Sequence, residues 1–439
     1  MEWYIVGGLA IGLVILLMGL SVPVAVAFFA ISAMGMAYYA TGDSGLMQIA
    51  INAPAAITQF AFVPVPLFLL MGELFFHTGI ANRVFNAFDA LFGRLPGRLS
   101  YVTVAGGTAF AALSGNSMGN TAMLGSLMVP EMTKRGYKKH MSMGPILGTG
   151  GLAMIIPPSG LAVLLGSLAK IDVGKLLIAG VVPGLILAVF YSTLIYVQVK
   201  IDPDAAPQYD VERMPWRRRL SMIATQILPM SVVIFLVIGL IVLGIATPEE
   251  SAAFGVLGVL MLAAFFRVLT WSSIVKSLTG TLRVTCMVLF IVMASSAFSQ
   301  ILAYSGATRN LVDAISTVQL APFLILLLMF FVLLVMGMFM DVVSIMLITI
   351  PIFFPLAISI GYDPIWFGIV MLLSIEISMV TPPFGLGLFV MLGVAPKGTT
   401  LGDVSRAAAP YVFCDMLLFA LIVLFPLVVL FLPSQMGTP

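Results

Sequence analysis

The chain has 439 residues, of which 61% are hydrophobic and 9% are charged, and its net charge is +2. Soluble domains carry about 25% charged residues, so this composition excludes an ordinary soluble enzyme or a nucleic-acid-binding protein. Apolar runs recur from Ile5 almost to Leu432 and leave no room for a large domain outside the membrane. We therefore expect an all-α polytopic membrane protein.

Apolar runs that can cross a hydrocarbon core of about 30 Å, at about 1.5 Å per helical residue, predict ten crossings. In chain order they lie at residues 3–20, 22–39, 60–78, 138–168, 175–200, 222–245, 248–270, 283–304, 364–391 and 407–433.

Two other stretches do not fit this count. Residues 101–132 have small polar residues at their centre, and each arm is too short to cross, so we expect a re-entrant helical hairpin whose tip lies at mid-depth. Residues 321–355 have Gly337 and Asp341 at their centre and predict a second re-entrant hairpin. Two full spans are the alternative for this second stretch.

The basic residues fall on one side of this topology. Seventeen of the 20 Lys and Arg residues lie on the side of the first hairpin's ends, and only Lys170, Lys175 and Arg309 lie opposite. Cytoplasmic loops of membrane proteins carry the excess of Lys and Arg, so both termini are predicted to be periplasmic. Replacing a hairpin by two spans leaves this count unchanged, so the charges do not distinguish those alternatives.

The chain repeats itself at an offset of 225 residues, which predicts two related halves, 1–220 and 221–439. The matches are Asn116 with Asp341, Pro130 with Pro355, Gly136-Tyr137 with Gly361-Tyr362, Pro157-Pro158 with Pro382-Pro383, and Gly160 with Gly385. Four crossings and one hairpin separate the two Pro-Pro helices, so the repeats are predicted to be inverted. Inverted repeats with interrupted helices are typical of secondary transporters.

Each half is predicted to hold scaffold helices, a hairpin and a broken helix. The broken helices are 138–168 and 364–391, because each contains a Pro-Pro pair that interrupts the backbone hydrogen bonds. A simple proline kink is the alternative for either one. Ser159 and Thr381 place a hydroxyl beside each break.

Backbone carbonyls and side-chain oxygens at such breaks suit sodium ions, and helix N-termini suit a carboxylate. We predict that sodium ions are bound by Ser114, Gly115, Asn116, Gly150, Pro157, Pro158, Gly337, Asp341, Glu376, Ser378, Thr381, Pro382 and Pro383. We predict that the solute contacts Ser117, Asn120, Thr121, Ser159 and Ser344. Asp341 and Glu376 are acids inside the membrane and are functional candidates for that reason, although Glu376 could instead join two helices, and proton coupling is a further alternative.

Two weaker features have structural interpretations. Glu73 and His77 lie one helical turn apart and could form a proton pair, but a hydrogen bond near a helix end is the simpler interpretation. The basic loop from Asp202 to Arg219 could bind anionic lipid headgroups, but it also serves as a topology anchor.

Four motifs resemble the large membrane subunit of tripartite ATP-independent periplasmic (TRAP) transporters. They are Leu113-Ser114-Gly115-Asn116-Ser117, Ile156-Pro157-Pro158-Ser159, Gly361-Tyr362-Asp363-Pro364 and Thr381-Pro382-Pro383. The resemblance implies a sodium-driven importer of the bacterial inner membrane, with the elevator-type architecture of the ion transporter superfamily. It also implies two partners, a small four-span membrane subunit and a periplasmic solute-binding protein that delivers sialic acid, C4-dicarboxylates or other organic acids.

Three other functions compete with this interpretation. A stand-alone anion:sodium symporter or antiporter of the same architecture would need no binding protein. An intramembrane enzyme would need clustered catalytic groups, whereas the two histidines, His77 and His140, lie on separate segments. A passive channel would not accumulate solute against its gradient.

Overall fold

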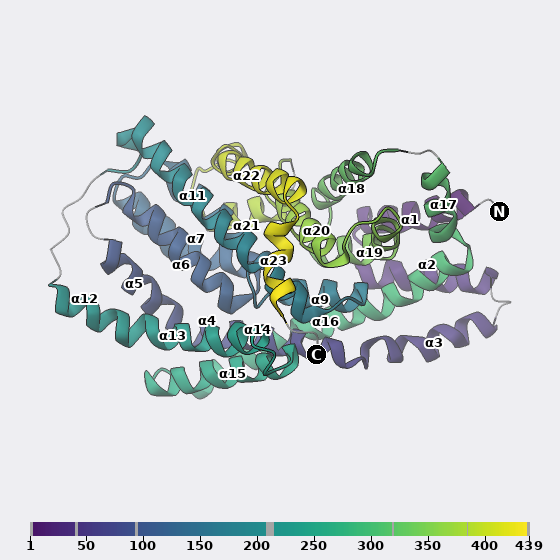
Figure 1. The fold of residues 1–439 in the computed structure, drawn as a ribbon, viewed down its shortest axis with the longest axis horizontal. Helices are drawn as coiled ribbons and strands as arrows, with labels where there is room; N and C mark the ends of the chain where they lie inside the picture. Colours follow the sequence, from purple (N-terminus) through teal and green to yellow (C-terminus); the bar gives the residue numbers. More distant parts are fainter. Residues whose placement is uncertain are drawn as a thin grey trace.

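The computed structural model describes residues 3–39, 43–92, 95–207, 215–317, 320–383 and 385–436. Within these ranges it contains helices and no strand (Figure 1). The first half contains α1 (Trp3–Gly19), α2 (Val24–Tyr39), α3 (Asp43–Ile57), the 3-10 turn η1 (Phe60–Phe62), α4 (Pro64–His77), α5 (Ile80–Phe92), α6 (Arg98–Ser114), α7 (Ser117–Lys134), α8 (Lys139–Ile155), α9 (Gly160–Ala169), α10 (Val173–Ala179), α11 (Val181–Ile201) and η2 (Pro203–Ala205).

The second half begins with one helix that two π turns interrupt. It contains α12 (Trp216–Met222), η3 (Ile223–Ile227), α13 (Leu228–Ile234), η4 (Phe235–Gly239), α14 (Leu240–Val242), α15 (Pro248–Phe265), α16 (Trp271–Tyr304), α17 (Ala307–Thr317), α18 (Pro322–Gly337), α19 (Val342–Ser359), α20 (Pro364–Met379), α21 (Leu386–Val394), α22 (Leu401–Leu424) and α23 (Leu427–Gln435).

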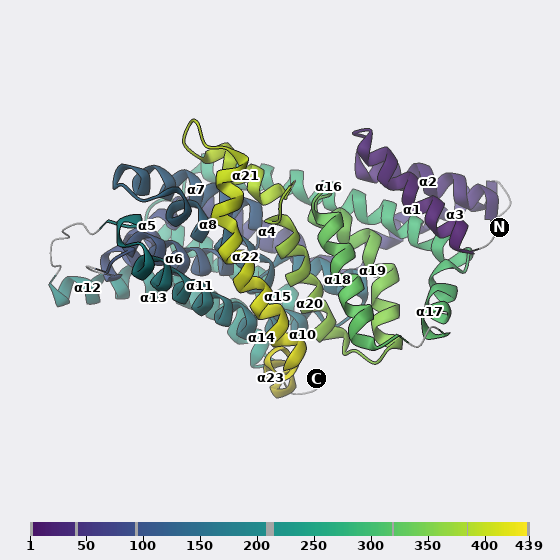
Figure 2. The same ribbon diagram turned by 90° about the horizontal axis from the view of Figure 1, so that it is seen from above.

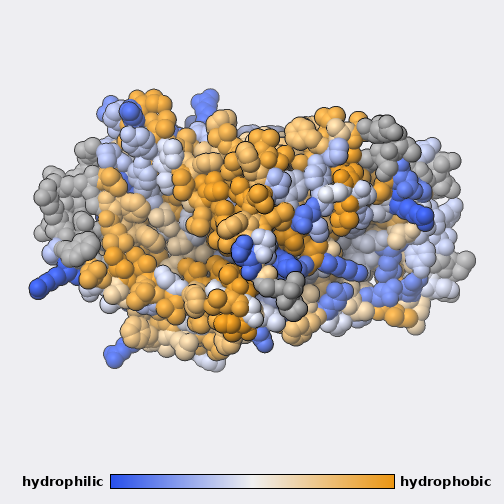
Figure 3. Space-filling model, in the orientation of Figure 1, coloured by the Kyte–Doolittle hydropathy of each residue, from blue (hydrophilic) through white to orange (hydrophobic). Residues whose placement is uncertain are grey.

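Every predicted crossing coincides with one or more of these helices. Within the described ranges, eight helical stretches are long and apolar enough to cross a membrane, and four shorter apolar helices accompany them. Hydrophobic side chains also cover much of the face in Figure 3, whereas soluble monomers rarely expose apolar patches larger than about 600 Å². The prediction of an all-α polytopic membrane protein is confirmed.

Some boundaries differ from the prediction. The helix predicted at 283–304 begins at Trp271, where Thr270 and Ser273 form a capping box, and Lys276 and Arg283 lie inside the helix without ending it. Its 34 residues extend for about 51 Å. Helices α3, α5 and α17 were not predicted, because α5 and α17 are amphipathic and all three are too short to appear as apolar spans.

The element order occurs twice. Helices α7 and α19 begin at residues 117 and 342 and end at residues 134 and 359, so both ends keep the offset of 225. Helices α8 and α20 begin at residues 139 and 364, and α5 and α17 begin at residues 80 and 307. The described helices therefore repeat as the sequence does, while the inverted orientation of the two halves stays a prediction.

The helices make two main sets of contacts, and Figures 1 and 2 show where these helices lie. In the α4–α16 group, α16 packs against α2, α3 and α4, and α15 packs against α4. In the hairpin group, α8 packs against α6, α7, α11, α20 and α22, and α20 packs against α18 and α19. In α8 every residue from Met141 to Ile155 is buried, and in α20 every residue from Ile365 to Met379 is buried. Helices that are apolar on every side are suited to such central positions.

Glycines let neighbouring helices approach α8 closely. A Cβ on Gly144 would lie 2.5 Å from Cε2 of Tyr411, and one on Gly148 would lie 3.0 Å from Cζ of Tyr191. One on Gly151 would lie 1.7 Å from Oε1 of Glu376. Small residues at such spacings let membrane helices pack tightly, so α8 accommodates large side chains from α22, α11 and α20.

Ion pairs fix the start of α8. Lys139 Nζ lies 2.8 Å from Asp403 Oδ2 at the start of α22. Lys138 pairs with Asp202 at the end of α11, and the hydrogen bond from Lys138 lowers the pKa of the Asp202 carboxyl. Both contacts are exposed, so solvent and salt screen the attraction between the charges. Their main effect is to hold the start of α8 next to the end of α11 and the start of α22.

The junction of α10 and α11 supports the last turn of α8. A Cβ on Gly180 would lie 2.0 Å from the carbonyl oxygen of Ile155, a backbone atom that cannot rotate away. We expect Gly180→Ala to lower stability by about 3 kcal/mol, the upper range for an overpacked core, measured as a lower Tm of the detergent-solubilised protein. Gly12→Ala in α1, with nothing within 4 Å of its Cβ, is the control and should leave Tm nearly unchanged. Equal Tm values for the two variants would contradict this packing.

Candidate functional site

The first hairpin tip is formed by Gly115 and Asn116, between α6 and α7. Gly115 has a left-handed backbone with φ of 57°, and Asn116 caps α7, its Oδ1 accepting a hydrogen bond from the Gly119 N–H at 3.0 Å. A Cβ on Gly115 would lie 2.9 Å from the carbonyl oxygen of Pro158. Glycine therefore suits both the backbone and the close contact with the first break. The side chain of Ser114 lies outside the described part of the structure.

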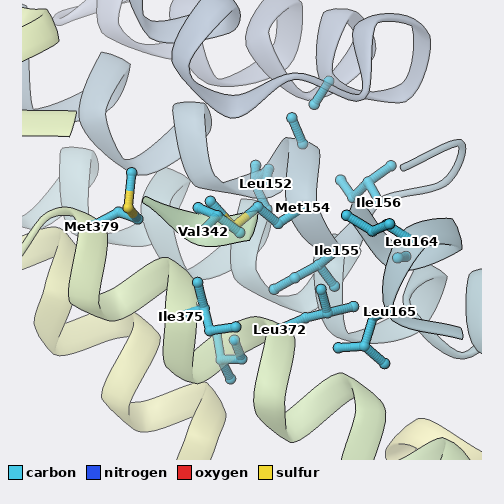
Figure 4. Close-up of a cluster of buried hydrophobic side chains, with 14 of the residues drawn as sticks. Leu152, Met154, Ile155, Ile156, Leu164, Leu165, Val342, Leu372, Ile375 and Met379 are labelled. Carbon is cyan, nitrogen blue, oxygen red and sulfur yellow. The ribbon is translucent and has the colours of Figure 1, made fainter. Parts of the chain in front are cut away.

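The first break lies between α8 and α9, and its Pro157-Pro158 peptide bond is cis. Ser159 is fully buried, donates a hydrogen bond to the Met154 carbonyl at 2.8 Å and accepts one from the Ala162 N–H at 3.2 Å. Figure 4 shows apolar side chains of α8, α9, α19 and α20 around this region. Apolar side chains from both halves therefore pack around the break. The Ser159 hydroxyl is already hydrogen-bonded to the last turn of α8 and the first turn of α9.

The second hairpin tip mirrors the first in its capping. Asp341 caps α19, and its Oδ2 accepts a hydrogen bond from the Ser344 N–H at 3.1 Å. The Ser344 hydroxyl, which is fully buried, also donates to Asp341. Asn116 and Asp341, which the repeat matches in sequence, thus have the same structural role.

Both tips line one central cavity of about 610 Å³. It lies between the hairpin group and the α4–α16 group, and Gly115, Asn116, Ser117 and Asp341 are among its lining residues. Helices α2, α4 and α16 supply its opposite wall, which is mainly apolar. A cavity of this size suits a small solute.

Three helix N-termini meet at this cavity. Asn116 and Ser117 begin α7, Gly160 begins α9, and Asp341 and Val342 begin α19, and all of them line it. Unpaired N–H groups and the helix dipole favour an anion at such ends. Among the described residues that line the cavity there is no Lys or Arg. The described backbone therefore provides the positive potential that a basic side chain would otherwise supply.

Other predicted residues of the first repeat lie behind the tip. Asn120 is fully buried and its Nδ2 donates to the Thr149 carbonyl at 2.9 Å, while its Oδ1 has no partner within the described ranges. Thr121 is buried and donates to the Ser117 carbonyl at 3.1 Å. A Cβ on Gly150 would lie 2.0 Å from the Oγ1 of Thr121. These residues join α7 to α8 and do not line the central cavity.

The predicted residues of the second repeat are divided. Gly337 and Ser378 are neighbours, since a Cβ on Gly337 would lie 1.8 Å from the Ser378 Oγ. Thr381 donates to the Ile377 carbonyl at 2.6 Å. Pro382 and Pro383, joined by a cis bond, are exposed. Thr381, Pro382 and Pro383 do not line the central cavity, and neither do Pro157, Pro158 and Ser159. The structure therefore brings both tips to the cavity together with Gly160, which follows the first break, and not the second break.

Glu376 lies between α8 and α20, away from the central cavity. It is 2% exposed, contacts Gly151 of α8 and interacts electrostatically with Asp415 of α22. Tyr191 of α11 donates a hydrogen bond to Asp415 at 2.5 Å. Our sequence reasoning missed Asp415, although it is an acid inside the apolar stretch 407–433, the same signal that identified Asp341 and Glu376. The apolar residues of α2, α4 and α16 that line the cavity carry no such signal.

Comparison with known proteins gives one matching family. Residues 11–428 match the model described as "Tripartite ATP-independent periplasmic transporter, DctM component". A C4-dicarboxylate TRAP transporter large permease protein from Pseudomonas aeruginosa is 32% identical, with 90% of this chain and 94% of that protein covered. An ectoine TRAP transporter large permease protein from Halomonas elongata is 30% identical, with 96% of each covered.

Solved structures give the same fold. The YdaH transporter of Alcanivorax borkumensis superposes with a TM-score of 0.68 at 11% identity, covering 92% of this chain and 98% of that one. MtrF of Neisseria gonorrhoeae superposes with a TM-score of 0.67 at 13% identity, covering 95% of each chain. The resemblance drawn from four motifs is thus confirmed over nearly the whole sequence. This chain is a membrane transport protein and not an enzyme, and it belongs to the family of DctM components, the large permeases of TRAP transporters.

Proposed function

We propose that this chain imports a small organic acid across the bacterial inner membrane, driven by sodium ions, with both of its termini in the periplasm. The observation that carries the proposal is the central cavity, where three helix N-termini and both hairpin tips meet and where the described lining includes no basic side chain. Relatives whose names specify C4-dicarboxylates or ectoine agree with a small organic solute.

A coupled cation explains the acid at the site. Asp341 lines the cavity, so an anionic solute there meets a carboxylate with no Lys or Arg among the lining residues. Two negative charges inside a membrane repel each other strongly. Sodium ions at the carbonyl and hydroxyl oxygens of the two tips would compensate that charge. Such oxygens adjoin a tip where Gly115 approaches the Pro158 carbonyl and where Gly337 approaches the Ser378 hydroxyl.

An elevator movement fits the arrangement of the helices. The solute site lies between the two helix groups, so sliding one group past the other would carry it across the membrane. The central cavity shares Leu69 and Asn116 with a second cavity between α4 and α7, and it shares no lining residue with a third cavity between α16 and α19. We infer that this state is open towards one side, which the charge distribution predicts to be the cytoplasm.

Family membership supports two partners for this chain, a small four-span membrane subunit and a periplasmic solute-binding protein. The chain covers 58% of a relative named isethionate TRAP transporter permease protein DctMQ from Oleidesulfovibrio alaskensis, so permeases with additional sequence exist in this family. A stand-alone anion:sodium symporter or antiporter is the second candidate function. The apolar outer face in Figure 3 would suit either lipid or a membrane subunit.

Reconstitution separates these candidates. We expect proteoliposomes to accumulate labelled C4-dicarboxylates or another organic acid only when this chain, the small subunit and the binding protein are all present under an inward sodium gradient. A potassium gradient and a proton gradient without sodium are the controls. Uptake by this chain alone would establish the stand-alone symporter, uptake driven by protons would remove the sodium claim, and equilibration without accumulation would identify a channel.

The site makes a second prediction. Asn116→Leu and Thr381→Leu should each reduce uptake by at least about tenfold, because an apolar side chain removes an oxygen at a tip or break, while membrane insertion is retained. Loss of the Asn116 cap costs about 1 kcal/mol, so Asn116→Ser, which keeps a capping oxygen, should retain measurable uptake. Thr193→Leu on the exposed side of α11 is the control for Thr381→Leu. Full activity of both Leu variants would refute the site.

A further inference from the structure

Two cavities flank the central one, and the internal repeat relates them. The α16–α19 cavity has a volume of about 560 Å³ and the α4–α7 cavity about 430 Å³. Their lining residues match in pairs, at an offset of 227 residues along α4 and α16 and of 225 along α7 and α19. The pairs are Leu69 with Ser296, Gly72 with Ser299, Glu73 with Gln300, Phe76 with Ala303, Ala122 with Leu347 and Ser126 with Pro351. The two cavities therefore use equivalent positions of α4 and α7 in one half and of α16 and α19 in the other, while residues 167–170 at the end of α9 line only the α16–α19 cavity.

The chemistry of the two chambers differs. The α4–α7 cavity contains Glu73, whose Oε2 lies 3.1 Å from Nε2 of His77, and its described lining includes no Lys or Arg. In the α16–α19 cavity the position of Glu73 is taken by the neutral Gln300, and Lys170 is added to the lining. The described lining of one cavity thus includes an acid, and that of the other includes a base supplied from the end of α9.

Lys170 is available to a ligand. It ends α9 in a left-handed conformation with φ of 55° and is exposed, and it has no ion-pair partner within the described ranges. The nearest acid in sequence, Asp172, caps α10 by accepting a hydrogen bond from the Lys175 N–H at 2.9 Å and does not line the cavity. The ten residues of α9 extend for about 15 Å from Gly160 at the central cavity. Lys170 thus marks a chamber one short helix away from the solute site.

We propose that the α16–α19 cavity is the entry chamber and that Lys170 attracts the carboxylate of the incoming solute there. The claim rests on the proposed function for its solute and on the predicted orientation, which puts Lys170 on the periplasmic side. A single base with hydroxyl neighbours such as Ser296 and Ser299 binds a carboxylate weakly enough to release it. The matching chamber with Glu73 lacks this base and favours departure of the anion.

The test measures the charge preference of each chamber and needs no solute. Cys286 and Cys414 are first replaced by Ala, and a single cysteine is then introduced as Ser299→Cys or Ser296→Cys in the entry chamber, or as Ser126→Cys in the other. The full-length protein in membrane vesicles reacts with an anionic reagent, sulfonatoethyl methanethiosulfonate, and a cationic one, trimethylammonioethyl methanethiosulfonate. The ratio of the anionic to the cationic rate reports the local potential.

We expect Lys170→Gln to lower this ratio by about three- to tenfold at Ser299→Cys, the effect of one unit charge within about 10 Å in a partly solvated cavity. Lys170→Arg should preserve the ratio, and Lys175→Gln, which removes a charge outside the cavity, should not change it. High salt should shrink the effect. At Ser126→Cys, Lys170→Gln should have no effect.

Two results would overturn the proposal. One is a ratio at both entry-chamber cysteines that does not respond to Lys170→Gln. The other is that neither entry-chamber cysteine reacts with either reagent, because an entry chamber must admit small ions. A charge preference that depends on Lys170 in a protein that imports no organic acid would leave the chamber in place and remove only the proposed solute. The chamber and the function therefore fail separately.

Discussion

A helix can end inside a membrane only where its unpaired N–H and C=O groups find partners or face a cavity. Three of the interior helix starts in this chain meet that constraint with a side chain of their own, since Asn116, Ser159 and Asp341 each cap the helix that follows. Residues at all three starts line the central cavity, namely Asn116, Ser117, Gly160, Asp341 and Val342. The same constraint that allows the breaks therefore creates the anion-favouring site.

Much of the fold follows from patterns that leave strong signals in sequence. The Pro-Pro pairs and the small polar run at Ser114–Ser117 are visible without any structure, because few sequences place such residues inside apolar stretches. Amphipathic helices such as α5 and α17 were missed, since they do not cross the membrane as apolar spans. That α5 and α17 are equivalent helices becomes visible when the two halves are aligned, because they begin at residues 80 and 307.

The candidate site was predictable only in part. Residue type identified Asn116 and Asp341, and the structure places both at one cavity. Residue type could not show that Glu376 contacts α8 of the other half, or that the second break lies away from the cavity, because those facts depend on how α8 and α20 cross. The wall formed by α2, α4 and α16 is apolar, and hydrophobic residues that face a cavity look in sequence like those that face lipid.

The contact between Gly151 and Glu376 joins two positions that the 225-residue offset makes equivalent. In an assembly of two identical unfused halves, the residue at this position would meet its own copy. A glutamate could not do so, because its carboxylate occupies the space where a Cβ of its partner would be. Only a chain whose two halves can mutate independently can therefore have Glu at one of these positions and Gly at the other. Gene fusion makes this asymmetric pair possible.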